Sequence, residues 1–229
     1  MRRNSLDGFA AETLAERFEA LTERMLDINK HMNLTTITDI DGIILKHYVD
    51  SLLISNLLPE NAKIIDVGCG AGFPSLPLAL SRPDLHVTAL DSTAKRVAYI
   101  KETAELLGIH NICAVSARAE DFSRMPEYRE KFDIATARAV ARLNILSELC
   151  IPFVRVGGQF IAMKARDDGE IAESVSAIKK LGGSDARLIH SELISDEQPL
   201  SRTIVRVEKL KRTPDIYPRN YAQIAKKPL

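Results

Sequence analysis

The sequence predicts an α/β fold with a mostly parallel, seven-stranded sheet. From Ala62 onward, short apolar runs alternate with longer amphipathic stretches, which is typical of strands joined by crossover helices. A glycine-rich turn follows the first apolar run, and two helical patterns precede it. Strands connected in this way lie parallel and are covered by helices on both faces.

The first sixty residues predict two helices. In residues 6–30, apolar side chains recur at steps of roughly 3.6 residues and form one face. A second helix is predicted over 41–58, with Asp39 or Asp41 as its cap. We therefore expect residues 1–60 to form an N-terminal helical extension.

Residues 61–210 predict the main domain. Its expected strands are 62–67, 86–91, 111–116, 132–136, 157–163, 185–193 and 202–209. Its expected helices are 73–82, 93–108, 142–151 and 168–181. No long helix separates the last two strands, so we expect them to pair antiparallel at the sheet edge.

Charge is distributed unevenly along the chain. The 229 residues include 31 basic and 31 acidic side chains, yet eight basic and only two acidic ones fall between Arg202 and Leu229. Such a basic end suits a polyanion, although a solvated tail has the same composition. We expect residues 211–229 to form a basic C-terminal tail that is packed on or near the active-site face.

The most informative motif joins the first strand to the first crossover helix. The strand ends on Asp66, and Gly68, Gly70 and Gly72 follow at alternate positions. A pyrophosphate-binding turn has the spacing G-x-G-x-x-G, whereas this one is G-x-G-x-G and an acid precedes it. The acid would repel a diphosphate but suits a cationic ligand. The second strand ends on Asp91, where a ribose diol would be held. The alternative interpretation of the glycine-rich motif is a tight strand-to-helix turn that binds no ligand.

This pattern resembles motif I of the Rossmann-like class I S-adenosylmethionine-dependent methyltransferases. On that basis Phe73 opens a helix beside the ligand, and Asp66 interacts with its cationic amino group. Ala119 and Glu120 follow the third strand, where an adenine amino group would be bound. Asp121 is the alternative to Glu120 for this contact. Alternatively, Glu120 only complements the dipole at a helix N-terminus.

The loop after the fourth strand should face the methyl acceptor. It contains Arg138 and Arg142, which are suited to guanine O6/N7 or to phosphate, and it has neither an Asn-Pro-Pro-Tyr motif nor a cysteine. We assign both arginines to acceptor positioning and expect no general base, because a ring nitrogen such as guanine N7 has no proton to lose. We interpret Cys69 as a packing residue and His47 as a hydrogen-bonded histidine rather than a catalyst.

Several further features exclude whole classes of protein. No apolar run reaches the roughly 18–20 residues that span a bilayer, and the N-terminus lacks the apolar region of a signal peptide. The three cysteines are scattered and form no C-x-x-C pair. We therefore expect a cytoplasmic protein without a metal or a membrane partner, and nothing in the sequence indicates more than a monomer.

From about Asn29 to Leu229 the chain resembles the RsmG (GidB) family of ribosomal RNA small-subunit methyltransferases. The motifs that carry this resemblance are Asn33-Leu34-Thr35, Lys46-His47 with Asp50-Ser51-Leu52, the run from Asp66 to Pro74, Asp91-Ser92 with Lys95-Arg96-Val97, Arg118-Ala119-Glu120, Arg138-Ala139-Val140-Ala141, Tyr217-Pro218-Arg219 and Lys227-Pro228-Leu229. The chain departs from the family pattern at Ser75 and Ala137, where glycine and serine are frequent, and at Asn220, where glycine is expected.

The resemblance implies S-adenosylmethionine as the methyl donor and N7 of one guanine in 16S ribosomal RNA as the acceptor. It implies cofactor contacts at Gly68, Phe73, Ala119, Glu120 and Arg138, and the partner is 16S ribosomal RNA or the small ribosomal subunit. From charge and position we expect RNA contacts at Lys95, Arg96, Arg142, Lys164, Arg212, Arg219, Lys226 and Lys227.

Three other functions remain to be weighed. A non-catalytic RNA factor could retain the fold and bind S-adenosylmethionine structurally, although Asp66, Asp91 and Glu120 are all present. A methyltransferase acting on a small molecule or a protein is less consistent with the basic C-terminal end. The glycine spacing and Asp66 disfavour a nucleotide-dependent oxidoreductase.

Overall fold

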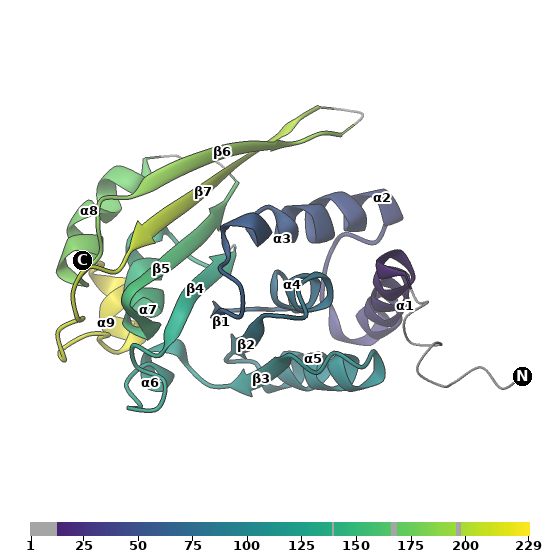
Figure 1. Ribbon diagram of the computed structural model, residues 1–229, viewed down its shortest axis with the longest axis horizontal. Helices are drawn as coiled ribbons and strands as arrows, with labels where there is room; N and C mark the ends of the chain where they lie inside the picture. The colour runs from purple at the N-terminus through teal and green to yellow at the C-terminus, as the bar shows by residue number, and fades with distance from the viewer. Residues whose placement is uncertain (1–12, 139, 166–168, 196–197) are drawn as a thin grey trace, which may run out of the picture.

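A computed structural model describes residues 13–138, 140–165, 169–195 and 198–229 (Figure 1). Its centre is a seven-stranded sheet in the order β3-β2-β1-β4-β5-β7-β6. The strands are β1 (Lys63–Val67), β2 (His86–Asp91), β3 (Ile112–Ser116), β4 (Phe132–Arg138), β5 (Val154–Lys164), β6 (Arg187–Leu193) and β7 (Leu200–Glu208).

The strand pairing confirms the predicted mostly parallel sheet. β1 pairs in parallel with both β2 and β4, and the β2–β3 and β4–β5 pairs are parallel as well. β7 pairs antiparallel with both β5 and β6, as predicted for the sheet edge. The chain proceeds outward from β1 to β3 and then returns to β4 on the other side of β1. The carboxyl ends of β1 and β4 therefore flank the point where an open α/β sheet binds its ligands.

Helices cover both faces of the sheet (Figure 1). The core on one face includes residues of α1 (Leu14–Met32), α4 (Ser75–Ser81) and α5 (Ala94–Leu106). The core on the other face includes residues of α6 (Ala119–Phe122), α7 (Leu143–Cys150), α8 (Glu170–Lys180) and α9 (Tyr221–Lys226). Strand residues such as Ile64 and Ile65 alternate between the two cores, which explains the continuous apolar runs of the parallel strands.

Helix α1 begins with a capping box and belongs to the N-terminal extension. The Thr13 hydroxyl accepts from the backbone N of Glu16, and the Glu16 carboxylate accepts from the backbone N of Thr13 at 2.6 Å. Leu21 and Met25 are fully buried on its inner face. The prediction of a helix over 6–30 is confirmed for the described part, while residues 6–12 lie outside the described residues.

The prediction of a helix over 41–58 is confirmed only as far as Leu52, and this helix contains an irregular turn that was not predicted. The segment consists of α2 (Ile40–Ile43), a π-helical turn η1 (Ile44–Val49), α3 (Asp50–Leu52) and a separate 3₁₀ turn η2 (Ser55–Leu57). Asp39 caps α2 by accepting from the backbone N of Gly42 at 2.6 Å. Tertiary contacts of His47 and Asp50 fix the irregular turn, and local periodicity contains no information about such contacts.

The C-terminal segment contains a short helix, α9, which the sequence did not predict. Asn220 caps α9 by accepting from the backbone N of Gln223, and Ile224 is fully buried against the second core. Helices α6 and α9 have four and six residues, too short to give a periodic signal. The predicted strand 157–163 begins earlier, at Val154, because the chain continues as a strand through Gly157 in the left-handed region.

Candidate active site

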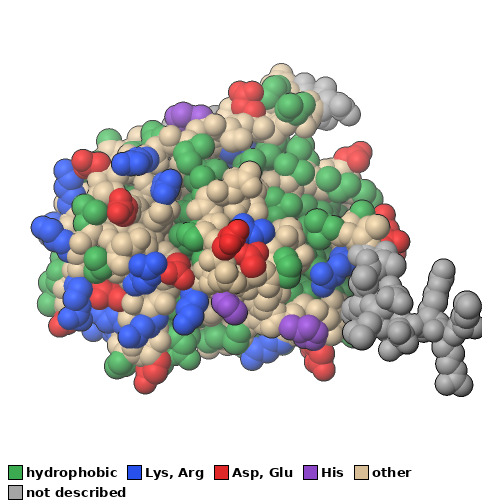
Figure 2. Space-filling view, in the orientation of Figure 1, with side chains coloured by type: hydrophobic (Ala, Val, Ile, Leu, Met, Phe, Trp, Pro, Cys, Tyr) green, Lys and Arg blue, Asp and Glu red, His purple; other side chains and the backbone are tan. Residues whose placement is uncertain are grey.

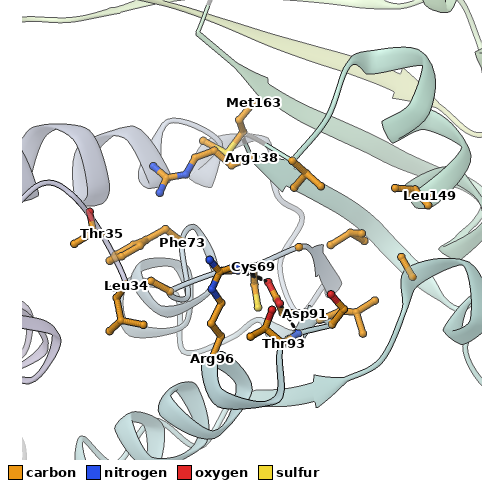
Figure 3. A pocket seen from close by; sticks show the side chains of 18 of the residues that line it. Leu34, Thr35, Cys69, Phe73, Asp91, Thr93, Arg96, Arg138, Leu149 and Met163 are labelled. Atoms are coloured by element: carbon orange, nitrogen blue, oxygen red, sulfur yellow. Dashed lines mark hydrogen bonds and ion pairs between the residues drawn. The ribbon is translucent and has the colours of Figure 1, made fainter. Parts of the chain in front are cut away.

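A cavity of about 1000 Å³ opens at the carboxyl ends of the parallel strands. Its walls come from the loops that follow β1, β2, β3, β4 and β5, and from residues 34–50 of the N-terminal extension (Figure 3). The predicted site residues that line it are Gly68, Gly70, Phe73, Asp91, Arg96, Ala119, Glu120, Arg138 and Lys164. Its position matches the ligand site expected for this topology.

The glycine-rich loop forms the floor of the cavity. The backbone N atoms of Gly68 and Cys69 donate to the carbonyl of Leu90, so the loop folds over the end of β2. Gly70 has a φ of +56°, and a Cβ there would meet nothing within 4 Å because the position faces open space. Gly72 does not line the cavity; a Cβ there would lie 2.5 Å from the Leu76 side chain. Gly70 therefore leaves room for a ligand, whereas Gly72 permits close packing.

Asp91 lies at the rim of this floor (Figure 3). Its Oδ2 accepts from the backbone N of Gly70 at 3.0 Å, and its Oδ1 accepts from the backbone N of Thr93 at 2.8 Å. The Arg96 guanidinium lies 3.8 Å from Oδ2. The carboxylate is thus held in place at the tip of β2, where a carboxylate can accept from a diol.

Asp66 lies beneath the glycine loop and does not line the cavity. It is 1% exposed, its Oδ2 accepts from the Ser75 hydroxyl at 2.5 Å, and its buried Oδ1 has no hydrogen-bond partner. Burial raises the pKa of Asp66 to about 6, against the opposing effects of Ser75 and Arg138. An unpaired carboxylate oxygen here suits a donor from the ligand side, either directly or through water.

Phe73 and Arg138 form the wall opposite Asp91 (Figure 3). The His47 ring stacks on Phe73 with centroids 4.5 Å apart, and the Arg138 guanidinium lies 5.5 Å from the Phe73 centroid. His47 Nε2 forms a hydrogen bond of 2.8 Å with the Thr35 hydroxyl. Burial, aided by the nearby Arg138 charge, lowers the pKa of His47 to about 4, so the ring is neutral at pH 7. His47 is therefore a packed, hydrogen-bonded wall residue.

The loop after β3 offers Glu120 rather than Asp121 to the cavity. Glu120 is buried and lines it together with Ala119 and Arg118, whereas Asp121 is exposed and does not. Ala119, Glu120 and Asp121 are consecutive residues of α6, so a one-residue step separates the inner from the outer side. Cys69 is also buried, and burial raises the pKa of its thiol well above the ordinary range, so it stays protonated.

Two cations predicted to face the acceptor, Lys164 and Arg142, make different contacts. The Lys164 amino group donates to the carbonyl of Ala141 at 2.9 Å and pairs with Glu170 at 2.8 Å. Glu170 also accepts from the backbone N of Leu143, so this pair ties down the loop after β4. Arg142 does not line the cavity and pairs with Glu173 at 2.7 Å, with both side chains about half exposed.

The other predicted RNA contacts also separate into two groups. Arg219 pairs with the fully buried Glu148 and so holds the C-terminal segment, whereas Arg212 pairs with Glu130 while its side chain stays 77% exposed. Lys95, Lys226 and Lys227 are exposed. Figure 2 shows Lys and Arg side chains on the side of the molecule where Figure 1 places α6, α8 and α9.

Sequence reasoning missed several residues of the cavity. Asp50 and Lys46 come from the N-terminal extension, Arg202 from β7, and Tyr221 from α9. Asp50 and Lys46 stand in motifs that carry the family resemblance, which was the available signal. Nothing in the sequence pattern singled out Arg202 or Tyr221, because their place depends on how distant segments pack.

The described residues lack two other kinds of feature. Within the described ranges, no group of three or more His, Cys, Asp or Glu side chains is arranged to hold a metal ion. No helix in the same ranges has the length and apolarity needed to cross a membrane.

Comparisons with known proteins show the family of the chain. Residues 14–196 match the family model described as "rRNA small subunit methyltransferase G". A protein named ribosomal RNA small subunit methyltransferase G from Lactobacillus delbrueckii is 45% identical over 220 residues, which cover 93% of this chain and 91% of that protein. The protein of that name from Desulforamulus reducens is 43% identical, with 95% and 90% covered.

Solved structures support the fold. TYW2 of M. jannaschii, a structure in complex with AdoMet, superposes with a TM-score of 0.57 at 16% identity. The match covers 76% of this chain and 80% of that one.

Proposed function

The chain belongs to the rRNA small subunit methyltransferase G (GidB) family, and we propose that it transfers the methyl group of S-adenosylmethionine to N7 of one guanine in 16S ribosomal RNA. The observation that carries the proposal is a single cavity in which the predicted cofactor residues Gly70, Asp91 and Glu120 meet an arginine-bearing wall. The family match covers residues 14–196, which include the residues that line this cavity except Arg202 and Tyr221.

The residues present fit S-adenosylmethionine. Asp91 would accept from the ribose hydroxyls, and Glu120 would read the adenine amino group. The open space at Gly70 admits the ligand against the backbone, and the unpaired Oδ1 of Asp66 suits the cationic end. A cavity of about 1000 Å³ has room for both this cofactor and a purine base.

The chemistry needs positioning more than proton transfer. The cofactor supplies an electrophilic methyl group on a sulfonium. Guanine N7 has a lone pair and no proton, so the chain needs only to place it in line with that methyl group. Neutral His47 and Phe73 form a wall of stacked rings, and the Arg138 guanidinium lies 5.5 Å from the Phe73 centroid. No described residue is required as a general base.

We assign the partner as 16S ribosomal RNA or the small ribosomal subunit, met by a monomeric enzyme in the cytoplasm. The exposed cations Lys95, Lys226 and Lys227 are available for phosphate contacts. Arg142 adds a half-exposed guanidinium beside the acceptor loop.

The test is a methyl-transfer assay with labelled S-adenosylmethionine. Small subunits lacking the modification, naked 16S RNA and bulk protein are offered in parallel, and the product nucleoside is identified by mass spectrometry. We expect 7-methylguanosine at one RNA position. Label in protein alone, or a bound cofactor without label in RNA, would overturn the proposal in favour of another acceptor or a binding factor.

A further inference from the structure

Asp50 links two arginines at the edge of the cavity. Its Oδ2 lies 3.1 Å from Nη1 of Arg138, and its Oδ1 lies 2.7 Å from Nε of Arg202. The Asp50 side chain is 9% exposed, and those of the two arginines are 16% and 18% exposed. One carboxylate of the N-terminal extension therefore joins β4 to β7 beside the site.

These contacts occupy one edge of the Arg138 guanidinium. Nη1 donates to the Lys46 carbonyl at 2.9 Å as well as to Asp50. In the described part of the chain, Nε and Nη2 of Arg138 have no hydrogen-bond partner. Those two donors form the other edge of the planar group, and such an edge matches a carboxylate with two parallel hydrogen bonds.

The surroundings of Arg138 indicate which part of a ligand it meets. Its guanidinium lies over Phe73, and its charge lowers the pKa of Asp66 and of His47. Asp66 is the acid suited to the amino group of the methionine moiety. In the methionine moiety, the carboxylate is attached to the same carbon as the amino group. If the amino group faces Asp66, this carboxylate would lie within reach of the Arg138 guanidinium.

We infer that Asp50 is a positioning residue for the cofactor: it holds Arg138 so that the Nε–Nη2 edge meets the carboxylate of the methionine moiety. The inference rests on the proposed function only in taking S-adenosylmethionine as the ligand. Because each oxygen of Asp50 accepts from an arginine, the role we assign to Asp50 acts through Arg138. Arg202 donates to Oδ1 of Asp50 and so fixes the direction in which Oδ2 meets Arg138.

The test compares two ligands that differ in one group. S-adenosylmethionine and decarboxylated S-adenosylmethionine are titrated by calorimetry into the full chain, without RNA. We expect the wild type to prefer the carboxylated ligand by about tenfold or more, as for a charge-assisted hydrogen bond. Asp50→Asn should remove most of that preference, while its affinity for the decarboxylated ligand stays within about twofold of the wild type.

Three variants separate positioning from general damage. Asp91→Asn should weaken both ligands equally and leave the preference intact, because it acts at the ribose. Asp50→Glu, which keeps the charge, should restore part of the preference. In an Arg138→Gln background, Asp50→Asn should have no further effect on the preference, since it acts through Arg138.

An unchanged preference in Asp50→Asn would overturn the inference, as would a parallel loss of affinity for both ligands. Thermal denaturation checks that each variant is folded at the titration temperature, and Asp50→Ser carries the same comparison if Asp50→Asn is not. A wild type that shows the preference but methylates no RNA would overturn the proposed function and leave the role of Asp50 standing.

Discussion

The carboxylate of Glu148, which is fully buried in α7, accepts three hydrogen bonds from Arg219 in the C-terminal segment. The donors are the backbone N at 2.8 Å, Nε at 2.9 Å and Nη2 at 2.6 Å. Nη1 of Arg219 donates in addition to the carbonyl of Lys227. The guanidinium that we predicted as an RNA contact is therefore used to dock the C-terminal segment onto the domain.

Arg219→Ala should destabilise the fold. It would leave the buried Glu148 charge without its partner, which costs about 3–5 kcal/mol in comparable cases. Urea denaturation measures the loss in the free energy of unfolding. Lys226→Ala, which removes the same charge from an exposed position, should change stability by less than about 0.5 kcal/mol. Equal stability of the two variants would contradict the structural role of Arg219, and Glu148→Gln should recover part of the loss in the Arg219→Ala background.

The exposed lysines of the C-terminal segment, by contrast, are suited to phosphate. Replacing Lys226 and Lys227 together by alanine should reduce RNA affinity and lower the slope of log K against log salt by roughly one to two, because fewer counterions are released. Filter binding at several salt concentrations measures that slope. The matched control is Lys30→Ala with Lys101→Ala, on α1 and α5, which should leave it unchanged. An unaltered slope in the first pair would remove this segment from the RNA interface.

The neighbouring acids of α6 provide a third test. Glu120→Ala should weaken S-adenosylmethionine binding by about tenfold, since Glu120 is buried at the cavity and would lose a hydrogen bond to the ligand. Asp121→Ala, one residue later and exposed, should bind as the wild type does. Calorimetry without RNA measures both affinities. The opposite pattern would give the adenine contact to Asp121.

Features that depend on neighbouring residues in the chain could be predicted from the sequence, whereas features that depend on contacts between distant segments could not. The strands, the glycine turn and the acid at the tip of β2 depend on local periodicity and spacing, and the predictions of a mostly parallel, seven-stranded sheet and of antiparallel pairing at its edge were confirmed. The π-helical turn at Ile44–Val49 and helix α9 depend on packing against distant segments. Local sequence does not record such contacts, so the two arginine partners of Asp50 could only be found in three dimensions.

The same limit applies to charge. A basic C-terminal end was visible in the sequence, but the sequence did not show that Arg219 is paired with a buried acid of the domain whereas Lys226 and Lys227 are exposed. A carboxylate 71 residues away in the chain decides the role of Arg219. Counting charges identifies a candidate surface, and pairing determines which of its members are available to a partner.

Asp66 gives a prediction for pH. Burial raises its pKa to about 6, so near pH 6 the free protein holds this carboxyl about half protonated. A cationic ligand beside it favours the charged form and lowers the pKa in the complex. Binding of S-adenosylmethionine at pH 6 should therefore release roughly half a proton, and affinity should rise with pH up to about 6 and then level off. His47, with a pKa of about 4, does not titrate in this range.

The measurement is calorimetry at pH 6 in two buffers with different ionisation enthalpies, because a released proton adds the heat of buffer protonation to the observed heat. Asp66→Asn is the control: it cannot release a proton at this position, so its observed heat should not depend on the buffer, and its affinity should be flat across pH 6. Equal heats for the wild type in both buffers would mean that the ligand does not change the ionisation of Asp66. The unpaired Oδ1 would then face a neutral donor or water instead of the cationic amino group.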